Sequence, residues 1–218
     1  MKPLHRLIGI AAPFNVSDVD TDRLIPHRFV REPLSAGYGR FLLHGDRYDA
    51  DGNEINDFLL NRPVYRTASI LVTGKNFGCG SSREAAVIAL ADFGIRVVIA
   101  ESFSDIFRAN CLQNGVLPVR LSRHAVEGLL RVLQGQPGAS MSVDLERQEV
   151  TGPQGDIHHF EIDASRKQQL LQGLDDINIT LANLEDIDAF ERAYRARFQW
   201  LTQTRTEAAV LVRGKAKP

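Results

Sequence analysis

The sequence predicts an α/β fold with a parallel sheet, and its central third carries the evidence. Residues 68–73, 97–100 and 116–121 are short apolar runs typical of buried strands. Residues 83–93 and 102–114, between those runs, have the length and composition of helices. Strands that alternate with helices through short loops indicate parallel pairing with right-handed crossovers. Apolar residues make up 44% of the chain and charged residues 24%, both ordinary for a globular protein.

The segment before this core is expected to begin with a strand and continue in loops. Residues 4–14 are apolar enough for the strand, and residues 15–26 are rich in Asp and Asn and end at Pro26. Residues 27–64 are punctuated by glycine and proline, and Asp51–Gly52 indicates a tight turn. A loop-rich region of this length inside a compact chain is often functional.

The central helices have recognisable ends. The first is expected to stop at Gly94. Ser102, with Asp105 three residues later, predicts the N-cap of the second helix, which should end at Asn114–Gly115. Ser122 predicts the N-cap of a third helix ending near Gly135.

The pattern changes after the third helix. Residues 141–150 alternate and are expected to pair with residues 157–162 in a hairpin across GPQGD. Residues 164–173 predict a short helix. Asn183 is expected to cap a last helix, whose apolar residues at helical spacing are Leu184, Ile187, Phe190, Ala193 and Tyr194.

Composition limits the function classes. We expect residues 1–204 to form one domain and residues 205–218 a basic, mobile tail. Lys+Arg is 26 and Asp+Glu is 27, so the chain lacks the basic surplus of a general nucleic-acid binder. The longest apolar run, Ala85 to Ala91, is far shorter than the roughly 20 residues of a membrane-spanning helix. Two cysteines, Cys79 and Cys111, are too few for a disulfide framework, which favours a reduced, cytoplasmic setting.

Residues 74–84, GKNFGCGSSRE, carry the strongest chemical signal. They lie between a predicted strand and a predicted helix, at the sheet edge where α/β proteins bind ligands. Glycines let backbone amides approach a ligand, and a helix N-terminus favours negative charge. Arg83 adds a forked cation suited to a carboxylate. The segment therefore predicts a site for an anionic substrate, with the hydroxyls of Ser81 and Ser82 at hand.

Several familiar motifs are excluded. The Gly–Lys pair is not followed by the Ser or Thr of a Walker loop. Arg83 stands where a dinucleotide-binding loop needs its third glycine, and Glu84 where an esterase elbow needs glycine. Cys79 has no second cysteine nearby, so this chain alone is expected to hold neither zinc nor an iron–sulfur cluster through cysteines.

Plainer interpretations stay open from the residues alone. Ser81 and Glu84 have the spacing of a capping box, in which Ser81 would only satisfy helix amides. Cys79 has the character of a packing residue rather than a nucleophile. The aspartates of residues 18–22 fit an ordinary Asp-rich turn, and they lack the offsets of a calcium-binding loop.

Long ordered motifs of this chain resemble one family. GKNFGCGSSREAAVIAL, with VDTDRLIP upstream and FSDIFRANCLQNGVLPV downstream, closely resembles the small subunits of 3-isopropylmalate dehydratases, which are swivelling-domain members of the aconitase superfamily. RYDADGNEINDFLLNRP, the hairpin of the 140s and LLQGLDDINITL also fit, so the resemblance extends to about residue 200. It implies a swivelling β/β/α domain with a parallel βαβαβ core, an added β-hairpin and a C-terminal helix.

The resemblance also implies a reaction and a partner. Members of the family act in leucine biosynthesis as hydro-lyases that interconvert 2-isopropylmalate and 3-isopropylmalate through 2-isopropylmaleate. A large subunit binds a [4Fe–4S] cluster, and the small subunit closes the active site over the dicarboxylate substrate. We therefore expect a hetero-oligomer, with no cofactor or metal held by this chain.

Site residues follow from the resemblance position by position. Ser81 matches the serine that acts as the catalytic base, as an alkoxide. Ser82 matches its neighbour, which hydrogen-bonds the substrate, and Arg83 matches the arginine that grips a substrate carboxylate. Asp22, in the pair with Thr21, matches an aspartate that supports the active site at the subunit interface.

One departure leaves the substrate open. The family usually continues Ser-Ser-Arg-Glu with His-Ala-Pro, whereas this chain has Ala85, Ala86 and Val87. A small subunit for a related alkylmalate or alkylmaleate, of the citramalate or dimethylmalate type, is therefore one alternative. A non-catalytic binding or assembly protein on the same scaffold is another.

Overall fold

The computed structural model describes residues 1–201 and divides the chain into two compact units. The first unit is Met1–Asp175 and the second starts at Asp176. The predicted tail, residues 205–218, lies outside the described residues. The expectation of one domain over residues 1–204 stays a prediction.

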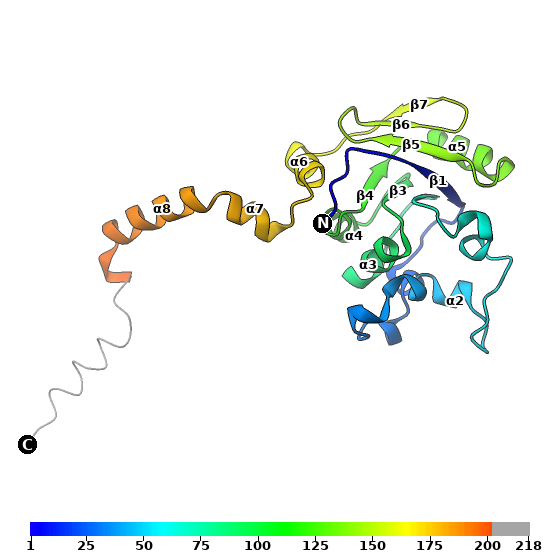
Figure 1. The fold of residues 1–218 in the computed structure, drawn as a ribbon, viewed down its shortest axis with the longest axis horizontal. Helices are drawn as coiled ribbons and strands as arrows, with labels where there is room; N and C mark the ends of the chain where they lie inside the picture. The colour runs from blue at the N-terminus through cyan, green and yellow to red at the C-terminus, as the bar shows by residue number, and fades with distance from the viewer. Residues whose placement is uncertain (202–218) are drawn as a thin grey trace, which may run out of the picture. The chain divides into compact units, whose positions relative to one another are not determined.

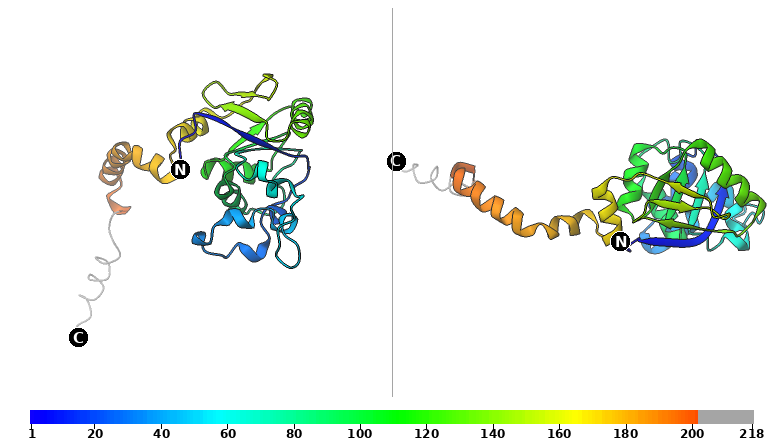
Figure 2. Two further views of the ribbon diagram at one scale, coloured as in Figure 1. Left: turned by 45° about the vertical axis from the view of Figure 1, so that its right-hand side comes forward. Right: turned by 90° about the horizontal axis from the view of Figure 1, so that it is seen from above.

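The first unit is built on a seven-stranded sheet with strand order β4-β3-β2-β1-β5-β6-β7 (Figure 1). Four strands are parallel: β1 Arg6–Phe14, β2 Ile70–Thr73, β3 Val97–Ala100 and β4 Leu117–Arg120. Three are antiparallel: β5 Ser140–Asp144, β6 Glu149–Thr151 and β7 Ile157–His159. Figure 2 shows β1, in dark blue, lying beside the yellow-green antiparallel strands. The predicted α/β fold with a parallel core is confirmed.

Helices cover both faces of the parallel strands because alternate strand residues point to opposite faces. Leu71 and Val98 pack in one apolar cluster with α3 (Glu84–Phe93), and Ile70 and Val97 pack in another with α5 (Arg123–Gly135). Helix α4 (Asp105–Gln113) contributes Phe107 and Cys111 to the α3 side. The chain therefore leaves β3 and β4, which are neighbours, in directions that lead to opposite faces.

The predicted ends of the central helices are confirmed except at the start of α4. Gly94 ends α3 with φ at 114°, and the Ser122 hydroxyl accepts a hydrogen bond from the Ala125 amide at the start of α5. Ser104 rather than Ser102 precedes α4, and it makes no side-chain cap bond. The Ser102 hydroxyl instead accepts from the Asn76 amide at 2.8 Å, because the loop after β2 lies alongside it.

The predicted hairpin is a three-stranded arrangement. The turn at residues 145–148, where Gln148 has φ at 56°, divides the alternating segment into β5 and β6. Strand β7 then pairs with β6 as predicted. Helix α6, Ala164–Gln172, follows and ends at Gly173 in the left-handed conformation.

The loop-rich region between β1 and β2 consists of single helical turns. They are α1 Thr21–Leu24, η1 His27–Phe29, η2 Leu34–Ala36, η3 Tyr38–Phe41, α2 His44–Arg47, η4 Leu59–Asn61 and η5 Pro63–Tyr65. Their apolar side chains join the α3 side of the core. This region therefore covers α3 and frames one side of the loop that follows β2.

The buried side chain of Arg47 holds this region together. Its guanidinium donates to Asn61 Oδ1 at 2.9 Å and to the Gly39 and Leu42 carbonyls at 2.9 and 3.2 Å. It also lies over the Phe93 ring, 5.1 Å from the centroid. Burial lowers the pKa of Arg47. One side chain thus connects three separate turns and the end of α3.

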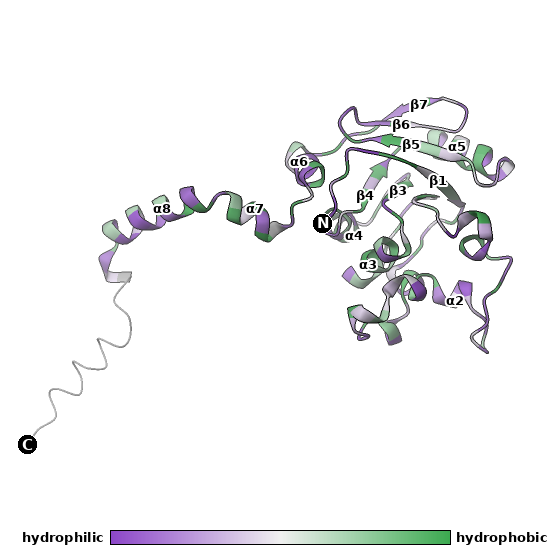
Figure 3. Cartoon of the chain, viewed as in Figure 1, coloured by the Kyte–Doolittle hydropathy of each residue, from purple (hydrophilic) through white to green (hydrophobic). Residues whose placement is uncertain are grey.

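The second unit, as far as it is described, consists of helices α7 Asp176–Ala182 and α8 Leu184–Arg197 and the turn η6 Gln199–Leu201. Asn183 precedes α8 as predicted, but its side chain makes no cap bond. Figure 3 shows hydrophobic and hydrophilic residues alternating along these helices. Leu184, Phe190 and Tyr194 are exposed. Within residues 1–201, no helix is both long and apolar enough to cross a membrane.

Candidate active site

The loop after β2 and the loop after β1 lie side by side, because parallel strands bring their carboxyl ends to one edge of the sheet. Asp20 and Cys79 form an isolated parallel bridge. The Gly78 amide donates to the Val19 carbonyl at 2.8 Å, and the Thr21 amide donates to the Cys79 carbonyl at 2.9 Å. The two motifs singled out in the sequence, VDTD and GCGSSR, therefore form one structural unit.

Two glycines are required for this loop to pack. Gly78 has φ at 74°, and a Cβ on it would lie 2.1 Å from Phe107 Cγ. Gly80 has φ at 88°, in the left-handed region that favours glycine. The loop can therefore rest on Phe107 of α4 while it presents the following residues at the surface.

Ser81 is held through its backbone rather than through its side chain. The buried Thr21 hydroxyl donates to the Ser81 carbonyl at 2.8 Å. The side chains of Ser81 and Ser82 are exposed, and neither hydroxyl makes a hydrogen bond within residues 1–201. Both hydroxyls are thus free to meet a substrate.

The capping-box interpretation of Ser81 is wrong. Helix α3 begins at Glu84 with Arg83 as its N-cap, and no side chain caps it. Glu84, the other member of the expected box, accepts instead from Asn114 Nδ2 at 3.0 Å. The spacing fits a box, but the helix begins two residues too late for Ser81 to be its N-cap.

Arg83 and Asp22 form an ion pair at the centre of the site. Arg83 Nη1 donates to Asp22 Oδ1 and also to the Ile25 carbonyl at 3.3 Å. The His27 amide donates to the same Asp22 oxygen at 3.0 Å. The Arg83 side chain is 18% exposed and that of Asp22 is 60% exposed. The arginine is therefore oriented by its neighbours, and the pair is open on one side.

This ion pair sets the ionisation of Asp22. The hydrogen bond from Arg83, then its charge and the His27 amide, hold the pKa of Asp22 below its ordinary value. A carboxyl whose folded-state pKa is depressed stabilises the fold above its unfolded pKa of about 3.9, and this stabilisation is lost as the pH falls through the folded-state pKa. The contribution is small because the carboxylate is well exposed.

Arg83→Gln is expected to raise the pKa of Asp22 toward its ordinary value, because it removes both the charged donor and the positive charge. A carbon-detected NMR titration of the Asp22 carboxyl measures this directly. Asp49, whose pKa is lowered by the hydrogen bond from the Asn53 amide, is the control and should titrate identically in the two proteins. An unchanged Asp22 pKa would contradict the ion pair.

The other aspartates and Cys79 have local roles. Asp20 Oδ1 accepts from the Arg23 amide at 2.7 Å and so caps α1, and Asp18 Oδ1 accepts from Asn76 Nδ2 at 2.8 Å. Burial, with the charges of Asp20 and Asp18, raises the pKa of the Cys79 thiol. A protonated thiol is a poor nucleophile, in line with the packing interpretation.

Residues 85–87, where this chain departs from the His-Ala-Pro pattern, lie in the core. Ala86 and Val87 are fully buried and Ala85 is 9% exposed, all three in the apolar cluster around α3. These residues therefore act on the packing beneath the loop, and they do not form the exposed surface that carries Ser81.

Ser102 and Asn76 also support the loop, and the sequence did not predict this role for either residue. Asn76 has φ at 55°, its amide donates to the Ser102 hydroxyl, and its side chain contacts Asp18. An Asn before Phe77 in a glycine-rich turn was an available signal, since Asn tolerates the left-handed conformation. The position of Ser102 beside it depends on the pairing of β2 with β3.

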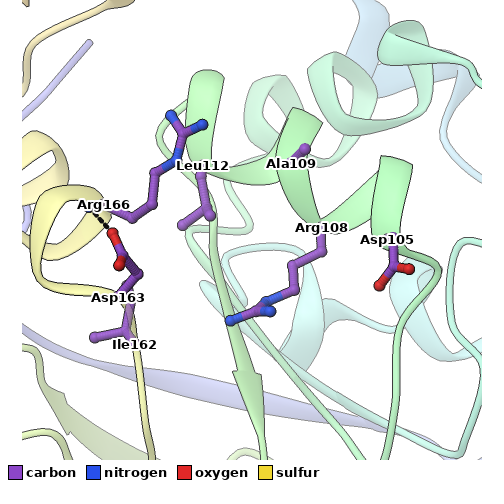
Figure 4. Close-up of a pocket in the computed structure, with 7 residues that line it drawn as sticks. All are labelled: Asp105, Arg108, Ala109, Leu112, Ile162, Asp163 and Arg166. Atoms are coloured by element: carbon purple, nitrogen blue, oxygen red, sulfur yellow. Dashed lines mark hydrogen bonds between the residues drawn. The ribbon is translucent and has the colours of Figure 1, made fainter.

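An open cavity of about 350 Å³ borders this site. It is lined by residues of α1 and α2: Asp20, Asp22, Arg23, Pro26, Gly45 and Asp46. Another cavity, of about 240 Å³, lies between α4 and the start of α6 and contains none of the candidate site residues (Figure 4). The first cavity includes Asp22 and is adjacent to the candidate site.

Comparisons with known proteins agree with this geometry. The family described as the aconitase C-terminal domain matches residues 1–124, and the LeuD_N family matches residues 127–164. A protein of Parvibaculum lavamentivorans is 48% identical over 92% of this chain and 100% of its own length, and one of Jannaschia sp. is 51% identical over the same shares. Both are named 3-isopropylmalate dehydratase small subunit. The chain belongs to this family.

A solved structure supports the same conclusion for the fold. The crystal structure of 3-isopropylmalate dehydratase from Methanocaldococcus jannaschii matches with a TM-score of 0.61 and 27% identity, covering 85% of this chain and 99% of that chain. The predicted swivelling-domain fold and the resemblance to 3-isopropylmalate dehydratase small subunits are confirmed. The roles of Ser81, Ser82, Arg83, Asp22 and Thr21 stay predictions.

Proposed function

We propose that this chain is the small subunit of a cytoplasmic hydro-lyase that isomerises 2-isopropylmalate to 3-isopropylmalate in leucine biosynthesis. The supporting observation is that free hydroxyls at Ser81 and Ser82 and an oriented guanidinium at Arg83 share one exposed loop. Family membership supplies the substrate class and the need for a large subunit.

The proposed chemistry removes water and adds it back. A proton leaves the carbon next to the one that carries the hydroxyl, the hydroxyl departs as water, and 2-isopropylmaleate results. Water then adds with the positions of hydrogen and hydroxyl exchanged, so the overall composition is unchanged. Each half of the cycle needs a group that takes or returns a proton at carbon.

Ser81 is our candidate for that group. A serine hydroxyl is a weak base in water, so its pKa must be lowered and water must be kept away. Arg83 is two residues away along the chain, and the start of α3, which no side chain caps, adds positive potential. Because the Ser81 side chain is exposed in this chain, a partner has to cover it. The large subunit is the proposed cover.

Arg83 and Ser82 are proposed to bind the substrate. The guanidinium of Arg83 can hold a carboxylate through two parallel hydrogen bonds, and the Ser82 hydroxyl can donate to another oxygen. Asp22, together with the Ile25 carbonyl, orients Arg83 before substrate arrives. Thr21 fixes the Ser81 backbone at the same time.

The iron–sulfur cluster that the family implies does not fit this chain. Such a cluster needs about three or four thiolates, and the chain has two cysteines, of which Cys111 is fully buried in the core. The large subunit would bind the cluster. The part proposed for this chain is substrate binding and proton transfer.

Substrate profiling of the chain reconstituted anaerobically with its large subunit tests the proposal. We expect kcat/KM for 2-isopropylmalate to exceed that for citramalate and for 2,3-dimethylmalate by at least about tenfold, or roughly 1.4 kcal/mol. A preference for either of the smaller substrates would replace the proposal with the related alkylmalate hydro-lyase. Absence of turnover with every substrate would favour a non-catalytic role.

Arg83→Lys is expected to lower kcat/KM of the assembled enzyme by at least about tenfold. The substitution keeps the charge but loses the fork that binds a carboxylate through two bonds. Steady-state kinetics with 2-isopropylmalate measure the effect, and Arg131→Lys, an exposed arginine on α5, is the matched control. Wild-type kinetics in Arg83→Lys would show that Arg83 does not hold the substrate.

A further inference from the structure

A second polar cavity lies at the sheet edge beyond β3 and β4, apart from the loop that carries Ser81. Its volume is about 640 Å³. Among the side chains that line it are three arginines, two glutamates and a histidine: Arg108, Arg120, Arg123, Glu101, Glu161 and His159. Ser81, Ser82, Arg83 and Asp22 are not part of this lining, so the cavity is separate from the candidate active site.

The topology explains why a crevice exists here. After β3 the chain passes into α4, whose Phe107 and Cys111 join the α3 side of the sheet. After β4 the chain passes into α5, which packs on the other side. Where connections from two neighbouring parallel strands diverge, a crevice opens at the carboxyl ends of the strands, and α/β proteins bind ligands in such crevices. Helix α3, which connects β2 to β3, lies on the same side of the sheet as α4. Among α3, α4 and α5, the side changes between α4 and α5, so the two diverging connections are those that follow β3 and β4.

Two of the three arginines in the crevice have side chains without a hydrogen-bond or ion-pair partner in the described part of the chain. Arg123 Nε donates to Glu127 Oε1 at 2.8 Å. The guanidinium groups of Arg108 and Arg120 make no hydrogen bond or ion pair within residues 1–201. Figure 4 shows Arg108 and Arg166 on α4 and α6, with guanidinium groups that point in opposite directions. Arg108 lines both this crevice and the cavity drawn there.

The remaining lining limits what the crevice can bind. Leu121 and Phe160 are buried beneath it. Glu101 and Glu161 offset part of the positive charge. The hydrogen bond and charge of Glu127, and then the charge of Glu101, raise the pKa of Arg123. Arg123 is already paired with Glu127, so the cations that the crevice offers to a ligand are Arg108 and Arg120. A compact anion therefore fits the crevice better than a long polyanion does.

We propose that this crevice binds a small molecule bearing a carboxylate or phosphate group, which Arg108 and Arg120 recognise. Forked guanidinium groups bind planar or tetrahedral oxyanions through charge-assisted hydrogen bonds. Arg120 stands at the end of β4 and Arg108 on α4, so the two cations approach the crevice from different elements. The site would be available in the isolated chain, since all its residues belong to the first unit.

Titration of the isolated full-length chain tests this proposal. Inorganic phosphate and succinate are added separately at constant ionic strength, and binding is followed by calorimetry and by amide NMR shifts. We expect saturable binding of at least one probe with a Kd below about 10 mM. The shifts should centre on Glu101, Leu121 and Ser122, and the probe that binds more tightly identifies the preferred oxyanion.

Matched variants separate this site from the alternatives. The double variant Arg108→Gln, Arg120→Gln should weaken binding at least tenfold, whereas Arg131→Gln on α5 should not change it. Arg83→Gln should leave the shifts at Ser122 intact, since that change affects the other site. Melting temperatures establish that each variant is folded.

Two results would overturn the proposal. They are the absence of saturable binding of either probe and an unchanged anion affinity in the double variant. If the double variant keeps its anion affinity and also loses assembly with the large subunit, the arginines form a docking surface for that subunit.

Discussion

Ser81→Ala is expected to lower kcat/KM of the assembled enzyme by about 10²–10⁴-fold while the chain folds and assembles normally. The structure sharpens this expectation, because the Ser81 hydroxyl makes no bond within the described chain and Arg83 is the N-cap of α3. The bond from Thr21 reaches the Ser81 carbonyl, which alanine keeps. Steady-state kinetics with 2-isopropylmalate, together with thermal melts, separate loss of chemistry from loss of fold.

Ser140→Ala is the matched control for Ser81→Ala. Ser140 is also exposed but lies at the start of β5, outside the candidate site. We expect its kinetics to match the wild type. Turnover of Ser81→Ala within a few-fold of wild type would remove Ser81 from the catalytic assignment, whatever the melting temperature shows.

Arg47→Met is expected to destabilise the first unit by about 3 kcal/mol or more. Methionine fills similar space, but it leaves the Leu42 carbonyl and Asn61 Oδ1 without their donor inside the core, and the Gly39 carbonyl keeps only the 3.4 Å bond from the Leu42 amide. Each buried acceptor left unpaired costs about 1–3 kcal/mol. Denaturant unfolding of the isolated chain measures the loss, and hydrogen exchange should locate it between residues 37 and 61.

Arg62→Met tests whether the effect is specific to burial. Arg62 is an exposed arginine in the same region, and its Nε donates only to the Asp57 carbonyl, at 3.1 Å. Its replacement should change the free energy of unfolding by no more than about 0.5 kcal/mol. Equal effects of the two substitutions would show that the network around Arg47 does not stabilise the loop-rich region.

Local sequence patterns predicted the structure correctly where the residues that carry the pattern lie within a few residues of the element that they form. The apolar run at residues 68–73 predicted β2, and the sequence Asn114–Gly115 predicted the end of α4. The glycine-rich loop was placed correctly between a strand and a helix, since a short apolar run bounded by turn residues indicates a buried strand and a longer apolar segment indicates a helix. Ser81, Ser82 and Arg83 could therefore be selected as site candidates.

Local patterns failed where two alternatives share the same spacing. Ser81 and Glu84 fit a capping box, and Ser102 and Asp105 fit an N-cap, yet neither pair forms one. Glu84 bonds to Asn114 and Ser102 to the Asn76 amide, both partners that are distant in sequence. A polar side chain takes the strongest partner that the fold brings to it, so sequence spacing alone does not decide between a local and a distant bond.

By itself, the sequence determined the fold class, the family and the loop that carries the candidate chemistry, because all three are written in contiguous motifs. Tertiary structure alone decided that Asp22 orients Arg83, that Ala86 and Val87 turn into the core, and that Arg47 is buried. It also brought Arg108 and Arg120 into one crevice. Each of these depends on which strands are neighbours and which face each helix covers, and pairing across a sheet joins residues that no short sequence window contains together.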